Sequence, residues 1–547
     1  MAATHINKKM KRRLNAAIIL CLTVCTASAQ TSLSKVWVAD LGNGEYQNPI
    51  LHADYSDPDA IRVGDDYYMT SSSFEDIPGL PILHSKDLVN WQIIGHALPA
   101  LTPGQHFKTP RHGDGVWAPS LRYHNNEFYL YYPDPDFGIY LLKAKDPKGP
   151  WSAPILVEGG KGLIDPCPIW QNNKAYLVHA YAGSRAGIKS VLVVKEMSWD
   201  GTKTISSGSI VYDGHDLDPT IEGPKIYFHN GYFYILAPAG GVSTGWQLAL
   251  RSRSIYGPYE RKVVMDQGKS TTNGPHQGAW VTTQTGEDWF LHFQDKEAYG
   301  RVVHLQPMEW KNGWPVIGVD ADGDGKGEPV VRFKKPNVGK SFARTTPVES
   351  DEFSGNVIGR QWQWMANAEA TWAFPFQTKG CLRLFSVQQS DSSKNLWGSA
   401  NILQQKFPAE EFVATAKLEF FPNKNINGER AGLCIMGLKY SGLCLEYNSG
   451  EISLLRITCD NSEKEKEKMV VLQKQVASLV YLRVKISAGA RCVFSYSADG
   501  SSFTEAPGEF MASPGKWKGA KIGLFCNRYS SINDAGWVDV DWFRIEK

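Results

Sequence analysis

The chain has 547 residues, which is too many for one ordinary hydrophobic core and leaves room for roughly two or three domains, or for a large repeat array plus a module. Lysine and arginine together number 58 and aspartate and glutamate 56, so no basic field exists to attract a nucleic acid. Aromatic residues make up 12%, a share typical of β-rich folds and of sugar-binding sites, where flat rings stack on sugar faces.

The N-terminal segment is typical of a signal peptide. Basic residues between positions 8 and 13 precede the apolar stretch AAIILCLTVCTA, and Ala27-Ser28-Ala29 before Gln30 fits a cleavage site. We therefore expect residues 1–29 to be removed and the protein to be exported, either to the periplasm or outside the cell. The apolar stretch is too short to span a bilayer, and no later window approaches the roughly 20 apolar residues that a span needs.

A repeat occupies residues 45–335. Five times, a polar turn is followed by an aromatic-rich strand with little helical periodicity around it. Repeats of about 50 to 60 residues, each long enough for a four-stranded sheet, predict a five-bladed β-propeller. The five copies are GDDYYMTSSS from Gly64, NNEFYLYYP from Asn125, NNKAYLVHA from Asn172, NGYFYILAPAG from Asn230 and GEDWFLHFQ from Gly286.

An acidic turn near the end of the repeat imitates the start of a calcium loop. Its carboxylates are Asp320, Asp322 and Asp324, separated by alanine and glycine. Glu328 comes too early to be the glutamate that closes such a loop, and no helical pattern flanks it. A polar surface turn is therefore the favoured interpretation, with a calcium loop as the alternative.

The segment after the repeat, residues 345–547, predicts a second domain. The irregular polar stretch between about residues 331 and 349 separates it from the repeat. Alternating strands such as LCLEYNSG, VYLRVKIS and GWVDVDWFRIEK favour a two-sheet, lectin-like sandwich. The sandwich either binds sugar or braces the propeller, and bracing is favoured because it shows no clear chemical motif. Seven cysteines beyond the signal peptide, at scattered spacings, predict no disulfide framework and no CxxC metal pair, with room for one bridge.

Three acidic residues stand at matching places of different repeats: Asp57, Asp165 and Glu222 precede the innermost strands predicted for the first, third and fourth blades. The innermost strands of a propeller converge on one axis, so these residues are expected to meet there. Breaking a glycosidic bond requires a carboxylic acid to protonate the leaving oxygen and a second carboxylate on the opposite side. The pattern therefore indicates a glycosidase.

Proline follows each of the three acids, either at once or after one glycine. Proline biases the residue before it toward an extended backbone, which predicts that the acids are held in one direction. The alternative is that Asp-Pro simply opens turns, as at Asp134-Pro135 and Asp146-Pro147. The register of three acids with the repeat favours the functional interpretation.

The repeat motifs resemble those of glycoside hydrolase family 43, and the segment after about residue 345 resembles the concanavalin A-like β-sandwich that follows the propeller in its xylosidase and arabinofuranosidase members. The resemblance covers almost the whole mature chain and implies an all-β fold. The motifs that carry it are NPILHADYSDPDAIRVGDDYY, SSSFEDIPGLPILHSKDLVNW, GVWAPSLRYHNNEFYLYY, LIDPCPIW, TIEGPKIY and GPHQGAW.

The resemblance implies Asp57 as the general base, Glu222 as the general acid and Asp165 as the carboxylate that tunes and orients the acid, in an inverting mechanism. A carboxyl close to two others in a partly dry pocket has a raised pKa, which suits a general acid. Inversion requires roughly 6.5 to 9.5 Å between acid and base, whereas about 5 to 5.5 Å would indicate retention.

Four further positions match the family. Phe74 and Trp117 fall where members place rings beside the sugar, and Arg301 where they place a hydroxyl-binding guanidinium; the alternatives are ordinary packing or a surface ion pair. His276 matches a histidine near the axis that helps to hold a structural calcium, often through water, although a lone histidine is more often a hydrogen-bonded core residue. No cofactor is expected for the chemistry itself.

A propeller with one closed axial end makes a pocket, and a pocket accepts chain ends. We therefore expect an exo-acting enzyme that releases terminal pentose from plant polysaccharide or oligosaccharide, with α-L-arabinofuranosidase slightly favoured over β-D-xylosidase. Asp59 and Cys167 depart from the commonest form of the family motifs, which leaves substrate choice open. The rival function is a non-catalytic carbohydrate-binding propeller, which would use the same aromatic residues without paired acids.

Overall fold

The computed structural model describes residues 33–390, 393 and 395–547. The predicted signal peptide, residues 1–29, lies outside the described residues. No helix in the described part of the chain is both long enough and apolar enough to cross a membrane. Helices there are confined to short pieces, namely α1 (Gly183–Ala186), η1 (His106–Lys108), η2 (Glu297–Tyr299) and η3 (Leu396–Gly398).

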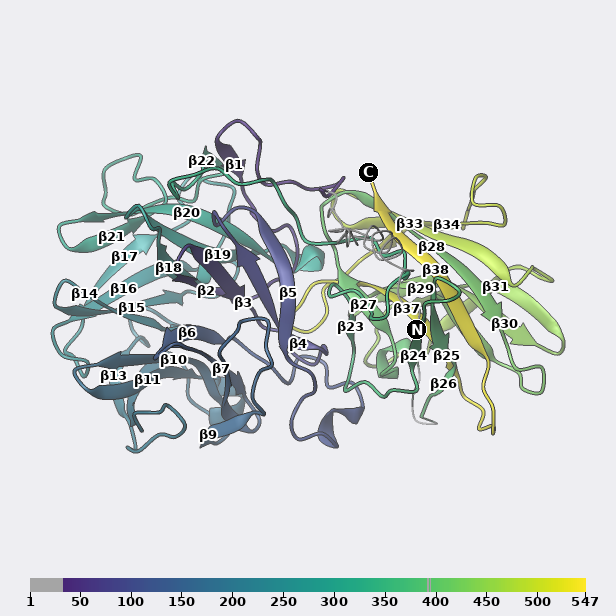
Figure 1. Ribbon diagram of the computed structural model, residues 1–547, viewed down its shortest axis with the longest axis horizontal. Helices are drawn as coiled ribbons and strands as arrows, with labels where there is room; N and C mark the ends of the chain where they lie inside the picture. Colours follow the sequence, from purple (N-terminus) through teal and green to yellow (C-terminus); the bar gives the residue numbers. More distant parts are fainter. Residues whose placement is uncertain (1–32, 391–392, 394) are drawn as a thin grey trace, which may run out of the picture. The chain divides into compact units, whose positions relative to one another are not determined.

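The first half of the chain forms five antiparallel four-stranded sheets, each built from consecutive strands (Figure 1). The innermost strands are β2, β6, β10, β14 and β18, and neighbouring ones contact each other around an axis. The prediction of a five-bladed propeller is confirmed. Blade 1 comprises β2 (Asp59–Val63), β3 (Asp66–Thr70), β4 (Gly79–Ser85) and β5 (Trp91–Leu98), and blade 2 comprises β6 (Ser120–His124), β7 (Glu127–Asp134), β8 (Gly138–Ala144) and β9 (Ile155–Gly159). Blade 3 comprises β10 (Leu163–Gln171), β11 (Lys174–Tyr181), β12 (Val191–Met197) and β13 (Ser209–Asp213), and blade 4 comprises β14 (Lys225–His229), β15 (Tyr232–Ala239), β16 (Trp246–Ser252) and β17 (Glu260–Met265). Blade 5 comprises β18 (His276–Thr282), β19 (Asp288–Asp295), β20 (Arg301–Lys311) and β21 (Trp314–Ile317).

The propeller core lies between blades rather than inside any one of them. Strands such as β7, with sequence EFYLYYPD, are buried on both faces because each blade packs against two neighbours. One apolar cluster joins Leu141 of blade 2 to Leu177 of blade 3, and another joins Val178 of blade 3 to Ile235 of blade 4. The aromatic and aliphatic composition of the second strand in each repeat follows from this double burial.

The two ends of the propeller are tied together outside the blades. Strand β1 (Glu45–Gln47) pairs with β22 (Arg332–Lys334), which sets Tyr46 opposite Phe333. Blade 5 also joins blade 1 at the axis, where the guanidinium of Arg62 donates a hydrogen bond of 2.7 Å to the carbonyl of Thr282. The ring of blades is therefore closed by strand pairing and by a side-chain contact.

The remaining strands form two eight-stranded sheets of a sandwich, drawn in green to yellow in Figure 1. Residues from both sheets, such as Leu433, Leu524, Val484 and Phe543, share one apolar core. The first sheet contains β23 (Gln363–Trp364), β26 (Val387–Gln388), β27 (Leu403–Lys406), β29 (Glu429–Met436), β30 (Tyr440–Asn448), β31 (Glu451–Cys459), β32 (Lys468–Gln473) and β37 (Lys521–Arg528). The second contains β24 (Ala373–Phe376), β25 (Cys381–Phe385), β28 (Phe412–Phe421), β33 (Leu479–Ser487), β34 (Arg491–Ser497), β35 (Thr504–Glu505), β36 (Phe510–Met511) and β38 (Trp537–Glu546).

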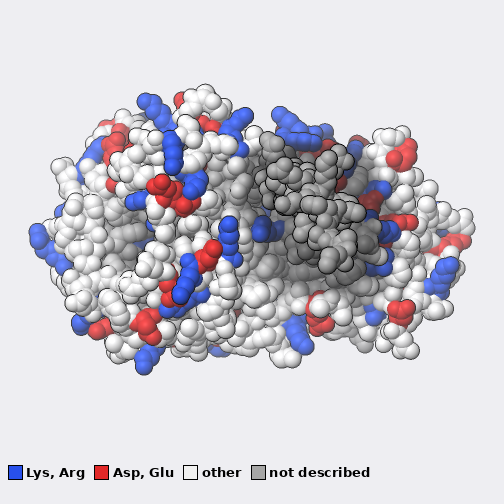
Figure 2. Space-filling view, in the orientation of Figure 1, with Lys and Arg blue, Asp and Glu red and all other residues white. Residues whose placement is uncertain are grey.

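The surface charges are mixed in sign, as the nearly equal numbers of cationic and anionic residues indicate, and the cysteines lie inside the protein. On the face drawn in Figure 2, cationic and anionic side chains are interspersed, without a continuous field of one sign. All seven cysteines of the described residues are buried and unpaired, and they form no disulfide there.

Candidate active site

The three predicted carboxyl groups come together at the propeller axis. Asp57 directly precedes the first strand of blade 1, Asp165 lies in the first strand of blade 3, and Glu222 precedes that of blade 4. They are close enough to act on one another electrostatically: the charge of Asp57 raises the pKa values of both other carboxyls, and the charge of Asp165 raises that of Glu222. Three blades therefore deliver one carboxyl cluster.

Asp57 is held by three donors. The hydroxyls of Ser72 and Ser56 donate to its Oδ2 at 2.5 and 2.6 Å, and Nη1 of Arg301 lies 3.3 Å from its Oδ1. The residue is only 5% exposed. Hydroxyl and guanidinium donors on a carboxylate form charge-assisted hydrogen bonds, which fix its direction. Asp57 is thus arranged as an oriented hydrogen-bond acceptor.

Glu222 has the environment of a carboxyl that keeps its proton. Burial raises its pKa to about 8, with further contributions from the negative charges of Asp165 and Asp57 that outweigh the opposing effect of Arg301. Its side chain is nevertheless 35% exposed, so it faces an opening rather than the closed core. A carboxyl in this state is able to donate a proton at neutral pH.

Asp165 links the cluster to the backbone of the acid. Its Oδ2 accepts a hydrogen bond of 2.7 Å from the N–H of Gly223, and Nε2 of Gln277 lies 3.5 Å from its Oδ1. Burial, opposed by the hydrogen bond from the Gly223 N–H and assisted by the charge of Asp57, raises the pKa of Asp165 to about 6. Asp165 therefore interacts electrostatically with both other carboxyls.

The prediction that proline holds these acids in an extended backbone is wrong for Asp57 and Asp165. Both have φ of +56°, in the left-handed region. In β10 the pairing with β11 shifts register between Ile164 and Cys167, so Asp165 sits on a bulge. A bulge re-aims a side chain, and aspartate tolerates left-handed φ better than most residues. The local fold thus overrides the bias that the following proline imposes.

The three predicted substrate-contacting residues differ in their burial and in their contacts. The guanidinium of Arg301 contacts Asp57 and covers the ring of Phe293 at 4.8 Å. Phe74 is 4% exposed and pairs through its backbone with Val116, next to Trp117. The indole of Trp117 donates to the carbonyl of Gly113 at 2.8 Å and is partly exposed.

One residue beside the site comes from the sandwich and was not predicted. Trp517, in the turn before β37, has its ring 5.8 Å from the ring of Trp117 in an edge-to-face arrangement. The guanidinium of Arg301 lies 6.0 Å from the Trp517 ring, which is 53% exposed. A single tryptophan in the sequence SPGKWKG carries no repeat or motif, so no signal in the sequence assigned it to a site in another domain.

The two departures from the family motifs meet beneath the cluster. Arg122 of β6 donates to Oδ2 of Asp59 at 2.7 Å and to Sγ of Cys167 at 2.8 Å, and the backbone N–H of Ile226 donates to the same sulfur at 3.3 Å. These residues belong to the first strands of four blades. Asp59 and Cys167 each lie two positions along the chain from a carboxyl of the cluster, Asp57 and Asp165, so this contact occupies the axis next to the carboxyls.

His276 lies beside the acid as a neutral ring. Its Nε2 is 3.5 Å from Oε1 of Glu222, and neither ring nitrogen has a hydrogen-bond partner within the described residues. Burial, then the charge of Arg301, lowers its pKa to about 3. Calcium prefers six to eight oxygen ligands, so one imidazole is no cage for it, but the unpartnered nitrogens fit a bound water.

The acidic turn brings Asp320, Asp322 and Asp324 together, with carboxylate oxygens within 4.8 Å of one another. Lys326 lies 2.9 Å from Asp324 and Lys311 lies 3.6 Å from Asp320, so two of the three charges already have counter-ions. The turn also uses the carboxylates to accept its own backbone N–H groups. These contacts agree with a polar surface turn.

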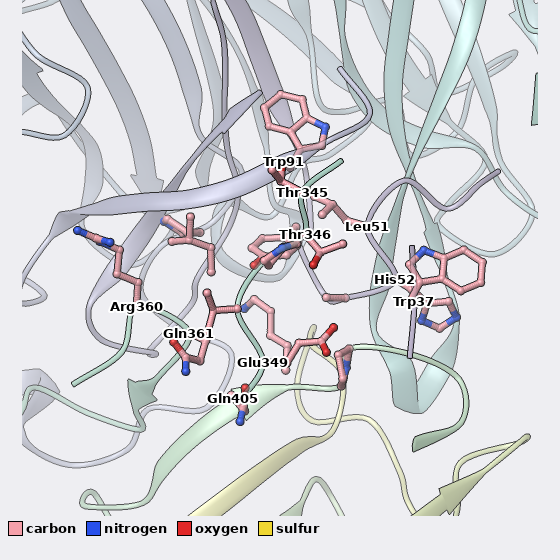
Figure 3. A pocket seen from close by; sticks show the side chains of 18 of the residues that line it. Trp37, Leu51, His52, Trp91, Thr345, Thr346, Glu349, Arg360, Gln361 and Gln405 are labelled. Atoms are coloured by element: carbon pink, nitrogen blue, oxygen red, sulfur yellow. The ribbon is translucent and has the colours of Figure 1, made fainter. Parts of the chain in front are cut away.

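A separate small cavity of about 60 Å³ lies where the propeller, the linker and the sandwich meet (Figure 3). Its lining includes Trp91 from the propeller, Glu349 from the linker and Gln405 from the sandwich, but none of the three catalytic candidates. Burial raises the pKa of Glu349 to about 7. This cavity is therefore a feature of the domain junction and not part of the carboxyl cluster.

Comparisons with known proteins show which family this chain resembles over both domains. The model of "Glycosyl hydrolases family 43" matches residues 46–315, and that of "Beta xylosidase C-terminal Concanavalin A-like domain" matches residues 350–546. A putative beta-xylosidase of Xylanibacter ruminicola is 36% identical, over 90% of this chain and 88% of its own. A beta-xylosidase of Formosa agariphila is 34% identical, over 95% and 93%.

Two further similarities extend the comparison. The non-reducing end alpha-L-arabinofuranosidase BoGH43B of Bacteroides ovatus is 28% identical, over 93% of this chain and 96% of its own. The crystal structure of xylan beta-1,4-xylosidase from Bacillus halodurans has a TM-score of 0.80 at 26% identity, covering 92% of this chain and all of that one. The chain, an all-β glycoside hydrolase with a five-bladed propeller and a concanavalin A-like domain, belongs to glycosyl hydrolase family 43.

Proposed function

We propose that this enzyme is an exo-acting, inverting pentosidase that releases terminal β-D-xylose from plant-derived oligosaccharides or polysaccharides. The observation that carries the proposal is the cluster of three carboxyls on one axis, in which a partly exposed Glu222 has its pKa raised to about 8. The xyloside is preferred because the relatives at 36% and 34% identity are named as xylosidases.

A terminal α-L-arabinofuranoside is the second candidate substrate. A relative at 28% identity is named as an arabinofuranosidase, and another at 26% is named as a xylosidase/arabinosidase. The sequence alone slightly favoured an arabinofuranoside over a xyloside, and this substrate preference is not confirmed. The identities of the named relatives now support the opposite order.

In the proposed reaction Glu222, in its protonated form, donates its proton to the glycosidic oxygen as the bond to the anomeric carbon breaks. Asp57 takes a proton from a water molecule, whose oxygen bonds to the anomeric carbon from the opposite face. The products are the free pentose with inverted configuration and the shortened chain. The donors on Asp57 from Ser72, Ser56 and Arg301 support its role as an oriented base.

Asp165 acts in this scheme without touching the substrate. Its charge helps to keep Glu222 protonated at neutral pH, and its hydrogen bond to Gly223 N–H holds the backbone beside the acid. Both effects serve proton donation, because a general acid works best when its pKa lies near the working pH. Asp165 is therefore assigned as the positioning residue of the acid.

Exo action is supported by what lies on either side of the cluster. The contacts of Arg122 with Asp59 and Cys167 occupy the axis next to the carboxyls, while the exposed ring of Trp517 lies near Trp117 and near Arg301, which contacts Asp57. A binding site of this kind accepts the end of a chain and excludes its middle. Phe74, Trp117 and Arg301 are assigned to substrate binding on this basis.

The acid–base steps require no cofactor. The unpartnered nitrogens of His276 suit a bound water, and through it His276 would help to hold a structural calcium. The signal-peptide pattern of residues 1–29 supports export to the periplasm or the medium as part of this proposal.

The test is hydrolysis of 4-nitrophenyl β-D-xylopyranoside and 4-nitrophenyl α-L-arabinofuranoside, with the first-formed anomer followed by proton NMR. We expect faster release from the xyloside and α-xylose as the first product. A first product with retained β configuration would contradict the assigned mechanism. Activity on neither substrate would contradict the proposed function.

A further inference from the structure

A buried ion network joins the sandwich to the propeller. Nζ of Lys518 lies 2.6 Å from Oε1 of Glu75 and 2.7 Å from Oδ1 of Asp76, and Nζ of Lys521 lies 2.7 Å from Oδ2 of Asp76. The two acids belong to blade 1 and the two lysines to the sandwich. None of the four side chains is more than 6% exposed.

Other polar groups complete the network. Nδ1 of His112 lies 2.9 Å from Oε1 of Glu75, the N–H of Gly113 donates to its Oε2 at 3.1 Å, and Nε2 of Gln404 donates to Asp76 at 2.8 Å. Burial alone would raise the pKa of Asp76, but the lysines lower it below its usual value. The acid is thus ionised and fully partnered.

The network is connected by short pieces of chain to the aromatic residues of the active site. Phe74 directly precedes Glu75, and Trp517 directly precedes Lys518. The indole of Trp117 donates to the carbonyl of Gly113, whose own N–H donates to Glu75. Each of the three rings is therefore one residue or one hydrogen bond from a member of the network.

The backbones on the two sides approach closely where the network lies. A Cβ at Gly113 would stand 2.9 Å from Cβ of Lys516, so even one methyl group would require movement of the turn that carries Trp517. The neighbouring part of the junction is less well filled, with its cavity of about 60 Å³. The residues on both sides of Trp517 are thus held, Lys516 by its close approach to Gly113 and Lys518 by its ion pairs.

We propose that Lys518 is a positioning residue for substrate binding: its ammonium group, held between Glu75 and Asp76, fixes Trp517 beside Trp117 and Arg301. This inference rests on the proposed function. The terminal sugar lies deepest, beside the carboxyls, and the half-exposed Trp517 ring therefore meets the part of the substrate that leaves.

Ion pairs suit such a role better than apolar contacts. A buried pair contributes little net stability, because desolvation offsets much of the attraction between the charges, but it permits only a narrow set of geometries. Lys518 contacts two carboxylates through one ammonium group, which constrains the adjoining residue from two directions.

The test compares xylobiose with β-D-xylopyranosyl fluoride, whose leaving group is a single atom. Lys518→Met should raise KM for xylobiose about five- to tenfold, as expected for a lost aromatic contact of about 1 kcal/mol, while KM for the fluoride stays within about twofold. Trp517→Ala should reproduce this pattern, and Lys518→Arg should restore most of the xylobiose affinity.

Arg430→Met is the matched control, because Arg430 forms an equally buried ion pair with Glu467 inside the sandwich, at 3% and 6% side-chain exposure. It should lower thermal stability without separating the two substrates. Equal effects of Lys518→Met on both substrates, or normal xylobiose kinetics in Trp517→Ala, would overturn the inference. If Lys518→Met does not fold, the Trp517→Ala and Lys518→Arg results decide it. A wild-type enzyme inactive on both substrates would instead overturn the proposed xylosidase function, and the inference with it.

Discussion

Oδ2 of Asp165 accepts a hydrogen bond of 2.7 Å from the backbone N–H of Gly223, the residue that follows Glu222. The same carboxyl raises the pKa of Glu222 through its charge. One side chain from blade 3 therefore contacts the backbone next to Glu222 of blade 4 and also raises the pKa of the Glu222 carboxyl through its charge.

The alkaline limb of the pH profile should report this relationship. The proposed mechanism requires a protonated Glu222, so kcat/KM should fall as the pH rises through the Glu222 pKa of about 8. Asp165→Asn removes a negative charge that opposes ionisation of Glu222, which lowers the pKa of Glu222 and should move the limb to lower pH. An alkaline limb that does not move in this variant would show that Asp165 does not tune the acid.

The hydroxyl of Ser72 should matter for rate more than for binding. Ser72→Ala removes the 2.5 Å hydrogen bond to Asp57 Oδ2. A hydrogen bond to a charged group contributes about 1.5–3 kcal/mol, so kcat should fall about 10- to 100-fold with little change in KM. Ser71→Ala is the control, because its hydroxyl contacts only the Ser72 carbonyl, at 3.3 Å, and not Asp57. Equal losses in the two variants would remove Ser72 from the account.

The axial contact below the carboxyls should be essential for stability. Arg122→Met leaves the fully buried Asp59 without its counter-ion, so the free energy of unfolding should fall by about 3–5 kcal/mol. Denaturant unfolding measures this directly, with the exposed Arg253→Met as control. A loss below about 1 kcal/mol, the size typical of surface ion pairs, would show that Arg122 is not the partner that stabilises Asp59.

Local pattern was sufficient to predict the propeller. Each aromatic-rich repeat contains the second strand of one blade, because burial between two neighbouring blades imposes the same composition five times. Repetition also located Asp57, Asp165 and Glu222, since equivalent positions of different blades must meet at the axis. The left-handed φ of Asp57 and Asp165 was missed, and for Asp165 it coincides with a bulge in the pairing of β10 with β11, which the following proline does not reveal.

Contacts between distant parts of the chain were beyond prediction. Trp517 and Lys518 approach residues that are about 400 or more positions earlier, and no repeat or spacing links the two segments. The hydroxyls on Asp57 were likewise missed, because serine is common in loops and only the folded geometry shows which one donates. Such contacts have no signal in a single sequence.

The central claim is that Glu222 donates the proton to the leaving group. The most direct measurement is kcat/KM for xylobiose with the variant Glu222→Gln. This substitution keeps the size of the side chain and removes the proton that it would donate. Glu309→Gln, at an exposed position, is the control. The account predicts a loss of about 10²- to 10⁴-fold for Glu222→Gln and none for the control. A Glu222→Gln enzyme with wild-type activity would contradict it.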